Sequence, residues 1–175
     1  MEDKQKRKSL RVGDRIVRLG QVYQIFRIEK KKTSGKEEKI IHFKPFFKNR
    51  SNKTLTCSIP VNNLAKANIR RSISRKGLRK LFQGFSEKTK KEKLIDIHEA
   101  SNALSLNDIH KVVQVMKSFW IGKNKKAVKL SKSQSDIFQL SKDRLEEETA
   151  SVEGLSLLEA RKKIGAALKR INLAS

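Results

Sequence analysis

The 175-residue sequence contains few of the residues from which disulfides and metal centres are built. Cys57 is its only cysteine, so no disulfide can form within the chain, which is typical of a protein in a reducing cytosol. The three histidines are scattered and show no metal-ligand spacing. We therefore expect neither a metal nor a cofactor.

Long apolar runs and catalytic motifs are absent as well. No run of 18 apolar residues occurs, and the first ten residues, MEDKQKRKSL, lack the apolar core of a signal peptide. The sequence has no phosphate-binding glycine loop, clustered carboxylate pair or nucleophile motif. These absences predict a cytoplasmic protein that is not an enzyme and does not span a membrane.

Positive charge, by contrast, is in large excess. Lys and Arg number 42 against 18 Asp and Glu, which gives a net charge of +24. Such a chain attracts polyanions through counterion release, and nucleic acid is the commonest cellular polyanion; an anionic membrane surface and an acidic protein are the alternatives. Residues 1–86 hold 24 basic and 6 acidic residues, a difference of +18, whereas residues 87–175 hold 18 and 12, a difference of +6.

The first half has the apolar pattern of β-strands. The segments RIVRL, QVYQIFRI, KIIHFKPFF and TLTCSIP are rich in Val, Ile, Tyr and Phe, and turn signals separate them around Gly20, Gly35 and residues 48–53. Four or five short strands with tight turns predict a small antiparallel barrel, with Pro45 and Pro60 at a strand end, an edge or a bulge.

The rest of the chain, from Pro60 onward, is predicted to be helical. RKGLRKLFQGF, at 75–85, spaces its apolar residues as a helix does, and another helix is expected from about Lys90 to Ala103. Gly122 and Gly154 are expected to end helices. Three more helices are expected to begin at capping boxes: Ser105 with Asp108, Ser131 with Gln134, and Ser156 with Glu159.

The only tryptophan, Trp120, stands in VMKSFWIGKNKKAVK, beside a group of lysines. It continues an apolar stripe that includes Leu106 and Met116, which favours a core tryptophan over one that contacts nucleic acid. The lysines after it form either a solvated basic loop or a loop that contacts phosphates. They are Lys123, Lys125, Lys126 and Lys129.

Three other basic runs have to be weighed in the same way. The run at 4–8 is expected to be a disordered tail, and the run at 70–80 forms either a basic helical face on a polyanion or a solvated surface. The run EKTKKEK, at 87–93, places lysines at a helix entrance, which the helix dipole disfavours unless an anion binds there. A ligand-binding role is favoured for these lysines, which are Lys88, Lys90, Lys91 and Lys93.

Several motifs, taken in order, resemble the CarD/CdnL family of bacterial transcription regulators over roughly residues 9–172. The first half carries SLRVGDRIVRLGQVYQIFRIE and then LTCSIPVNNLAKANIRRSISRKGLRKLF. The second half carries LSLNDIHKVVQVMKSFW, KLSKSQSDIF and EARKKIGAAL. The order of these motifs, their spacing and the change from strands to helices together carry the resemblance.

The resemblance implies an α+β protein in which a small N-terminal antiparallel Tudor-like β-barrel is followed by a compact all-α C-terminal domain. We expect a basic disordered tail at 1–9, a Tudor-like RNA-polymerase-interacting domain at 10–68, a helical connector at 69–86 and a helical DNA-binding domain at 87–173. In this family the barrel docks on the β subunit of RNA polymerase, partly by strand-edge addition. The helical domain touches promoter DNA at the edge of the melted bubble, where a tryptophan wedges into the minor groove.

Site residues carry over from the family by position. The two polymerase-binding arginines fall at Lys31, which keeps the charge, and at Ser58, which loses it; Ile59 and Pro60 complete the expected contact strand. The wedge position falls near Lys93, and no tryptophan stands there. The wedge is therefore either missing or supplied by a different residue, and phosphate contacts are expected to carry more of the DNA affinity, from Lys88, Lys90, Lys91 and Lys93. A second candidate contact is formed by Lys123, Lys125 and Lys126.

The residues and the resemblance together favour a transcription regulator, monomeric and located in the cytoplasm and nucleoid. It would bind the RNA polymerase β subunit and double-stranded promoter DNA, the latter largely without sequence preference, and modulate open-complex stability. The alternative is a stand-alone DNA-binding or nucleoid-associated protein, because the +18 first half could bind nucleic acid itself. An RNA-associated protein is a third hypothesis, which the match of the helical half disfavours.

Overall fold

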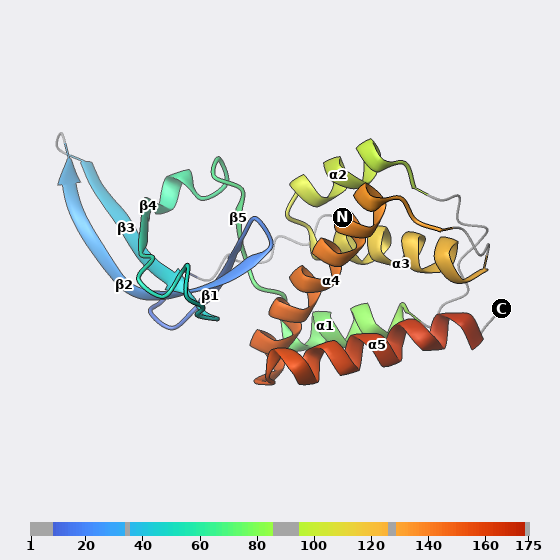
Figure 1. Ribbon diagram of the computed structural model, residues 1–175. Helices are drawn as coiled ribbons and strands as arrows, with labels where there is room; N and C mark the ends of the chain where they lie inside the picture. The colour runs from blue at the N-terminus through green and yellow to red at the C-terminus, as the bar shows by residue number, and fades with distance from the viewer. Residues whose placement is uncertain (1–8, 34–35, 86–94, 126–128, 174–175) are drawn as a thin grey trace, which may run out of the picture.

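Strands precede helices along the chain in the structure, a computed structural model that describes residues 9–33, 36–85, 95–125 and 129–173. Five strands are followed by five α-helices within these ranges, so the protein is α+β. Figure 1 shows the sheet at one end of the molecule and the helices at the other.

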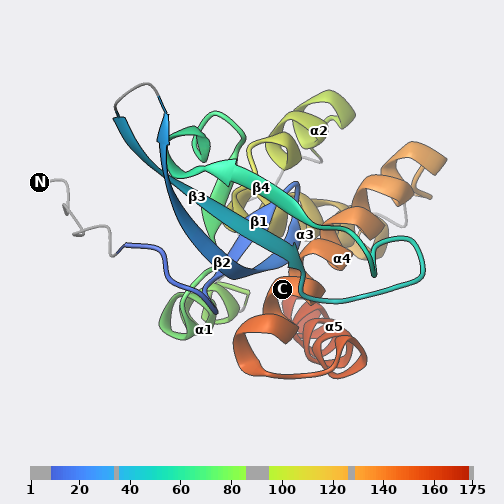
Figure 2. The ribbon, with the colours of Figure 1, turned by 90° about the vertical axis from the view of Figure 1, so that its left-hand side faces the viewer.

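The strands form one antiparallel sheet in the order β4-β3-β2-β1-β5. The sheet curls, as Figure 2 shows, but it stays open because β4 and β5 form its two edges. The expected barrel is therefore a half-barrel. The strands are β1 (Arg15–Arg18), β2 (Gln21–Thr33), β3 (Lys36–Pro45), β4 (Cys57–Pro60) and β5 (Ile69–Arg71).

Alternating side chains of the sheet are buried on its inner face, as the sequence pattern predicted. Tyr23 and Phe43 meet edge to face, with 5.4 Å between their ring centroids. A register shift between Ile25 and Arg27 marks a bulge in β2, and such bulges increase strand bending. The buried residues of this core are Ile16, Tyr23, Ile25, Ile41, Phe43 and Ile69.

The chain after Pro60 differs from the expectation of continuous helix. Val61–Asn63 form one turn of 3₁₀ helix, η1, and the chain then returns to the sheet. Residues 69–71, expected within a helical connector, form β5, which pairs with β1. The helices begin only after this strand.

The five helices pack around a second core. They are α1 (Arg75–Gln83), α2 (Ile97–Ser105), α3 (Ile109–Lys125), α4 (Lys132–Glu153) and α5 (Leu157–Leu173). The helix expected from Lys90 to Ala103 corresponds to α2, and residues 90–94 lie outside the described residues. Large buried residues of this core are Leu78, Phe85, Leu104, Met116, Phe119, Leu145, Ile164 and Leu168.

Two of the three predicted capping boxes are confirmed. Ser131 Oγ accepts from Gln134 N at 3.2 Å, and Gln134 Oε1 accepts from Ser131 N at 2.9 Å. Ser156 and Glu159 exchange the same two bonds at 3.2 and 2.8 Å. Both pairs satisfy backbone donors that a helix start otherwise leaves unpaired.

The third predicted cap is wrong, because Ser105 ends one helix and does not begin the next. Ser105 is the last residue of α2, and Asp108 caps α3 instead, its Oδ1 accepting from His110 N at 2.8 Å. Leu106, expected on the buried stripe, lies between these helices and is 60% exposed. Asn107, with a φ of 54°, turns the chain between the two helices.

One of the two predicted helix-ending glycines is confirmed. Gly154 ends α4 in the left-handed conformation, with a φ of 75°. Gly122 lies inside α3, which continues to Lys125, so its assignment as a helix end was wrong.

Candidate functional site

Strand β4 is an edge of the sheet and holds three of the residues expected to bind polymerase. Ser58, Ile59 and Pro60 all pair with β3 on one side only. Ser58 is exposed, whereas Ile59 is half-buried and packs against the sheet core. The strand can thus accept a further strand on its outer side, where backbone groups are unpaired by the sheet.

The position of Pro60 indicates which backbone groups of β4 face the open edge of the sheet. Proline has no N–H to give to a ladder, so an edge strand tolerates it where its nitrogen faces outward. Because backbone groups alternate in direction along a strand, the N–H and C=O of Ser58 face the same open edge. The hydrogen bond from Phe46 N to Val22 O, 2.9 Å, agrees with this direction, because it shows that the backbone groups of the even-numbered residues of β3 face β2. The residue that pairs with Ser58 is one of them, so the backbone groups of Ser58 in turn face away from β3.

Lys31, the fourth expected polymerase contact, is exposed on the β2–β3 hairpin. β4 ends at Pro60, which pairs with Ile40, and Lys31 lies two pairs beyond this point along β2, opposite Glu38. The structure thus brings Lys31 and the β4 edge to the same arm of the sheet.

The residues expected to hold DNA are only partly within the described residues. Lys123 is exposed near the end of α3, and Lys125 is the last residue of that helix. The described residues thus place one exposed lysine of this set beside the helical core. The others, Lys88, Lys90, Lys91, Lys93 and Lys126, lie outside the described residues.

Trp120 is part of the helical core, as its spacing predicted. It is half-buried and stacks on Phe138 of α4, with 6.3 Å between ring centroids. Its indole nitrogen is buried and has no hydrogen-bond partner in the described parts of the chain. Trp120 therefore stabilises the contact between α3 and α4.

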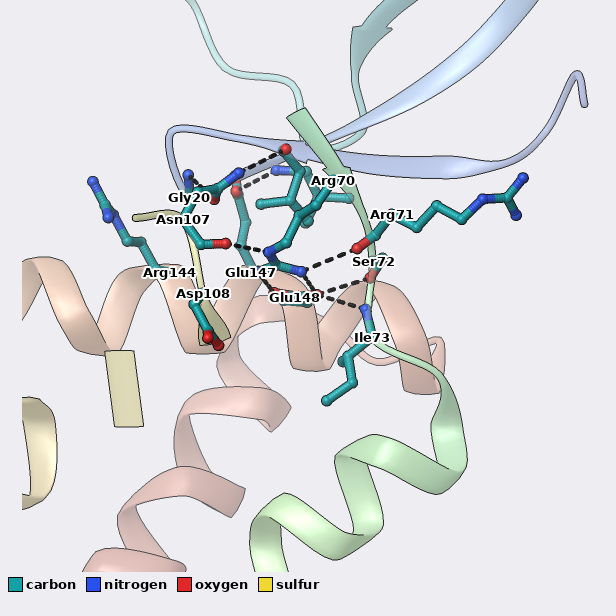
Figure 3. A network of polar contacts seen from close by, with 12 residues as sticks. Gly20, Arg70, Arg71, Ser72, Ile73, Asn107, Asp108, Arg144, Glu147 and Glu148 are labelled. Atoms are coloured by element: carbon teal, nitrogen blue, oxygen red, sulfur yellow. Dashed lines mark hydrogen bonds and ion pairs between the residues drawn. The ribbon is translucent and has the colours of Figure 1, made fainter. Parts of the chain in front are cut away.

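A polar network that the sequence did not reveal joins the sheet to the helices (Figure 3). Asn107, 2% exposed, accepts from Gly20 N at 3.2 Å and donates to Val17 O at 3.0 Å and Asn68 O at 2.8 Å. One amide side chain thus satisfies three backbone groups of the sheet region. Asparagine is also among the residues that tolerate the positive φ found here.

Glu148 of α4 is the centre of this network, with 1% of its side chain exposed. Arg70 of β5 donates to both carboxylate oxygens, each at 2.7 Å. Ser72 Oγ, at 3.2 Å, and Ile73 N, at 2.7 Å, donate to the same carboxylate. Arg70 Nε also donates to the carbonyl oxygen of Asn107. A buried carboxylate is stable only when it is neutralised and hydrogen-bonded in this way.

Other residues of α4 extend the junction. Glu147 Oε2 accepts from Val22 N at 2.9 Å, and Ser151 Oγ accepts from Arg15 at 3.2 Å. Burial raises the pKa of the Glu147 carboxyl; the bond from Val22 opposes this rise and the nearby charge of Asp143 adds to it. The junction therefore joins β1, β2, β5 and α4, and fixes the sheet relative to the helices.

Further observations concern metals, membranes and known proteins. In the described part of the chain, no group of three or more His, Cys, Asp or Glu residues is arranged to hold a metal ion. None of the described helices is long and apolar enough to cross a membrane. Comparison of the sequence with protein-family models and with curated proteins gave no match.

Proposed function

We propose that this protein is a transcription regulator that binds the β subunit of RNA polymerase through its sheet and promoter DNA through its helical part. The curled sheet would be the Tudor-like module that the sequence motifs imply. The observation that carries the proposal is the open β4 edge, where Ser58 presents backbone groups on the arm of the sheet that also holds the exposed Lys31. Strand addition supplies main-chain hydrogen bonds without requiring the missing arginine at position 58.

The junction supports a mechanism in which docking of the sheet positions the helices on the DNA. Because Arg70, Glu148 and Asn107 fix the sheet to the helices, docking of the sheet would hold the helical part at one position on the promoter. Such docking raises the effective concentration of the helices at the DNA, so weak phosphate contacts suffice. The protein acts by binding, in the cytoplasm and nucleoid, and changes the stability of the open complex.

The test is binding of the full chain to the polymerase β subunit at near-physiological and 500 mM salt. One-to-one binding is expected to persist at the higher salt, because main-chain hydrogen bonds are screened less than surface charges. Ser58→Pro removes the outward N–H and is expected to weaken this binding; Thr56→Pro, just before β4, is the control. Equal binding by all three proteins would refute docking through this edge.

The second candidate is a DNA-binding protein without a polymerase contact, which the +18 charge of residues 1–86 favours. It predicts that polymerase binding vanishes at 500 mM salt and is matched by plain DNA. The same experiment therefore separates the two functions.

A further inference from the structure

Helix α1, which lies in the basic run at 70–80, carries an exposed face on which every residue but one is basic. Its exposed positions follow helical spacing, and they are Arg75, Lys76, Arg79, Lys80 and Gln83. The opposite face packs into the helical core through Leu78 and Leu81. The helix contains no acidic residue. Four cations thus gather on one side of a helix of nine residues.

Little in the described protein neutralises this face. Arg75 donates to Val152 O at 3.1 Å, which uses one of its donors. Within the described ranges, the side chains of Lys76, Arg79 and Lys80 form no hydrogen bond or ion pair. Like charges three and four residues apart destabilise a helix by about 0.2–0.5 kcal/mol per pair. Fixed positive charge without internal compensation is what an external anion would neutralise.

The basic face continues into a hollow at the junction. This hollow, about 420 Å³, lies between the sheet and α1, and Arg15, Arg71 and Arg75 line it with one acidic residue, Asp14. Arg75 belongs to both the hollow and the exposed face. Positive charge therefore extends from the sheet along two turns of α1.

We propose that the exposed face of α1 is a second DNA-contacting surface, which holds the phosphate backbone of a duplex. Lys76 and Lys80 lie about 6 Å apart along the helix axis, comparable to roughly two steps of 3.4 Å along one DNA strand. A membrane surface fits less well, because the exposed positions of α1 carry no apolar side chain to enter lipid. The inference needs no polymerase contact and is separate from the lysines at 87–93.

The test compares two full-length variants with the same change in charge. Lys76→Gln, Arg79→Gln and Lys80→Gln together remove the three unpaired cations of α1. Lys48→Gln, Arg50→Gln and Lys53→Gln remove two lysines and one arginine that are exposed on the β3–β4 connection. Fluorescence anisotropy measures the affinity of each protein for two unrelated duplexes between 50 and 200 mM salt.

The α1 variant is expected to lose affinity equally for both duplexes. Its slope of log affinity against log salt should fall by about 0.9 per lost contact, hence about 2.7 for three contacts. Over the fourfold salt range, its disadvantage relative to the wild type should then shrink about 40-fold. The β3–β4 variant should retain the wild-type slope, and Arg79→Lys, which keeps the charge, should retain it too.

Two outcomes would overturn the inference. Equal losses in the α1 and β3–β4 variants would mean that net charge alone drives binding. An unchanged slope in the α1 variant, with lost binding to vesicles of anionic lipid, would assign the face to a membrane surface instead. Because Gln is a good helix former, unfolding of α1 is not expected, and circular dichroism checks this directly. If the α1 variant keeps the wild-type slope, the α1 contact is refuted, whereas the proposed function is not, because it depends on the other lysines.

Discussion

Substitutions of Arg70 and Glu148, singly and together, should show whether the two residues of this buried pair act as a unit. Arg70→Met removes both donors at 2.7 Å while Glu148 keeps its negative charge in a site that is 1% exposed. Loss of one partner of a buried ion pair costs about 3–5 kcal/mol, because the remaining charge is uncompensated. We expect a loss of this size in the free energy of unfolding.

Glu148→Gln should have opposite effects in the two backgrounds. In the wild type it removes the negative charge opposite Arg70, and the new amide nitrogen cannot accept the second hydrogen bond from Arg70, which should cost about 1.5–3 kcal/mol. In the Arg70→Met background it removes the uncompensated charge, and its amide oxygen can still accept from Ile73 N, which now lies at 2.7 Å from the carboxylate. There we expect a recovery of about 2 kcal/mol.

Urea unfolding, followed by far-ultraviolet circular dichroism and by the fluorescence of Trp120, measures these four free energies. Arg50→Met is the control, because Arg50 is exposed and its loss should change stability by less than about 0.5 kcal/mol. The coupling between the two substitutions should exceed about 2 kcal/mol. Additive effects, with Glu148→Gln destabilising both backgrounds equally, would refute the pairing on which the junction argument depends.

Three shorter predictions follow. The folded pKa of Glu147 is raised, so its contribution to stability is present below the unfolded pKa and is lost as pH rises through the folded pKa; Glu147→Gln should therefore compare more favourably with the wild type at pH 7 than at pH 4 in urea titrations. Ser156→Ala removes the cap of α5 and should lower the unfolding free energy by about 0.5–2 kcal/mol, whereas exposed Ser133→Ala should not. Replacing the lysines of 87–93 with Gln should weaken DNA binding uniformly across sequences and flatten the salt slope by about 0.9 per lost contact; a change in sequence preference would contradict the phosphate interpretation.

The longer elements could be predicted from sequence because their apolar spacing repeats. The strands β2 and β3 are 13 and 10 residues long and contain stretches rich in Val, Ile, Tyr and Phe, and the boxes at Ser131 and Ser156 fix two helix starts. β5 could not be predicted, because three residues with one buried side chain, Ile69, carry no periodicity. The Ser105 box failed because a competing cap, Asp108, stands three residues later.

The junction was missed for a different reason. A run of three glutamates, 146–148, in a helix has the composition of a solvated surface, and no spacing rule shows that two of them are nearly buried. Their partners Arg161 and Arg70 lie 15 and 78 residues away along the chain. One signal was present: consecutive acidic residues are unusual in a chain of net charge +24, and each of the three accepts at least one hydrogen bond.

Two arginines of this protein lie in opposite electrostatic environments, and added salt should change their contributions to stability differently. Arg70 is paired with a buried carboxylate, so its contribution to stability is screened little by dissolved ions. Arg79 stands exposed among Lys76, Lys80 and Arg75, so salt reduces the repulsion that it experiences in the free protein.

Added salt should therefore stabilise the folded protein while it weakens DNA binding. Three like-charge pairs on α1, at about 0.2–0.5 kcal/mol each, should contribute roughly 1 kcal/mol to this gain. The glutamine variant of Lys76, Arg79 and Lys80 should thus be more stable than the wild type at 50 mM salt and should gain less between 50 and 300 mM. Thermal or urea unfolding at both salt concentrations measures this difference. A wild type that loses stability with salt would mean that attractive surface ion pairs outweigh the repulsion, and the case for an external anion on α1 would lose its energetic basis.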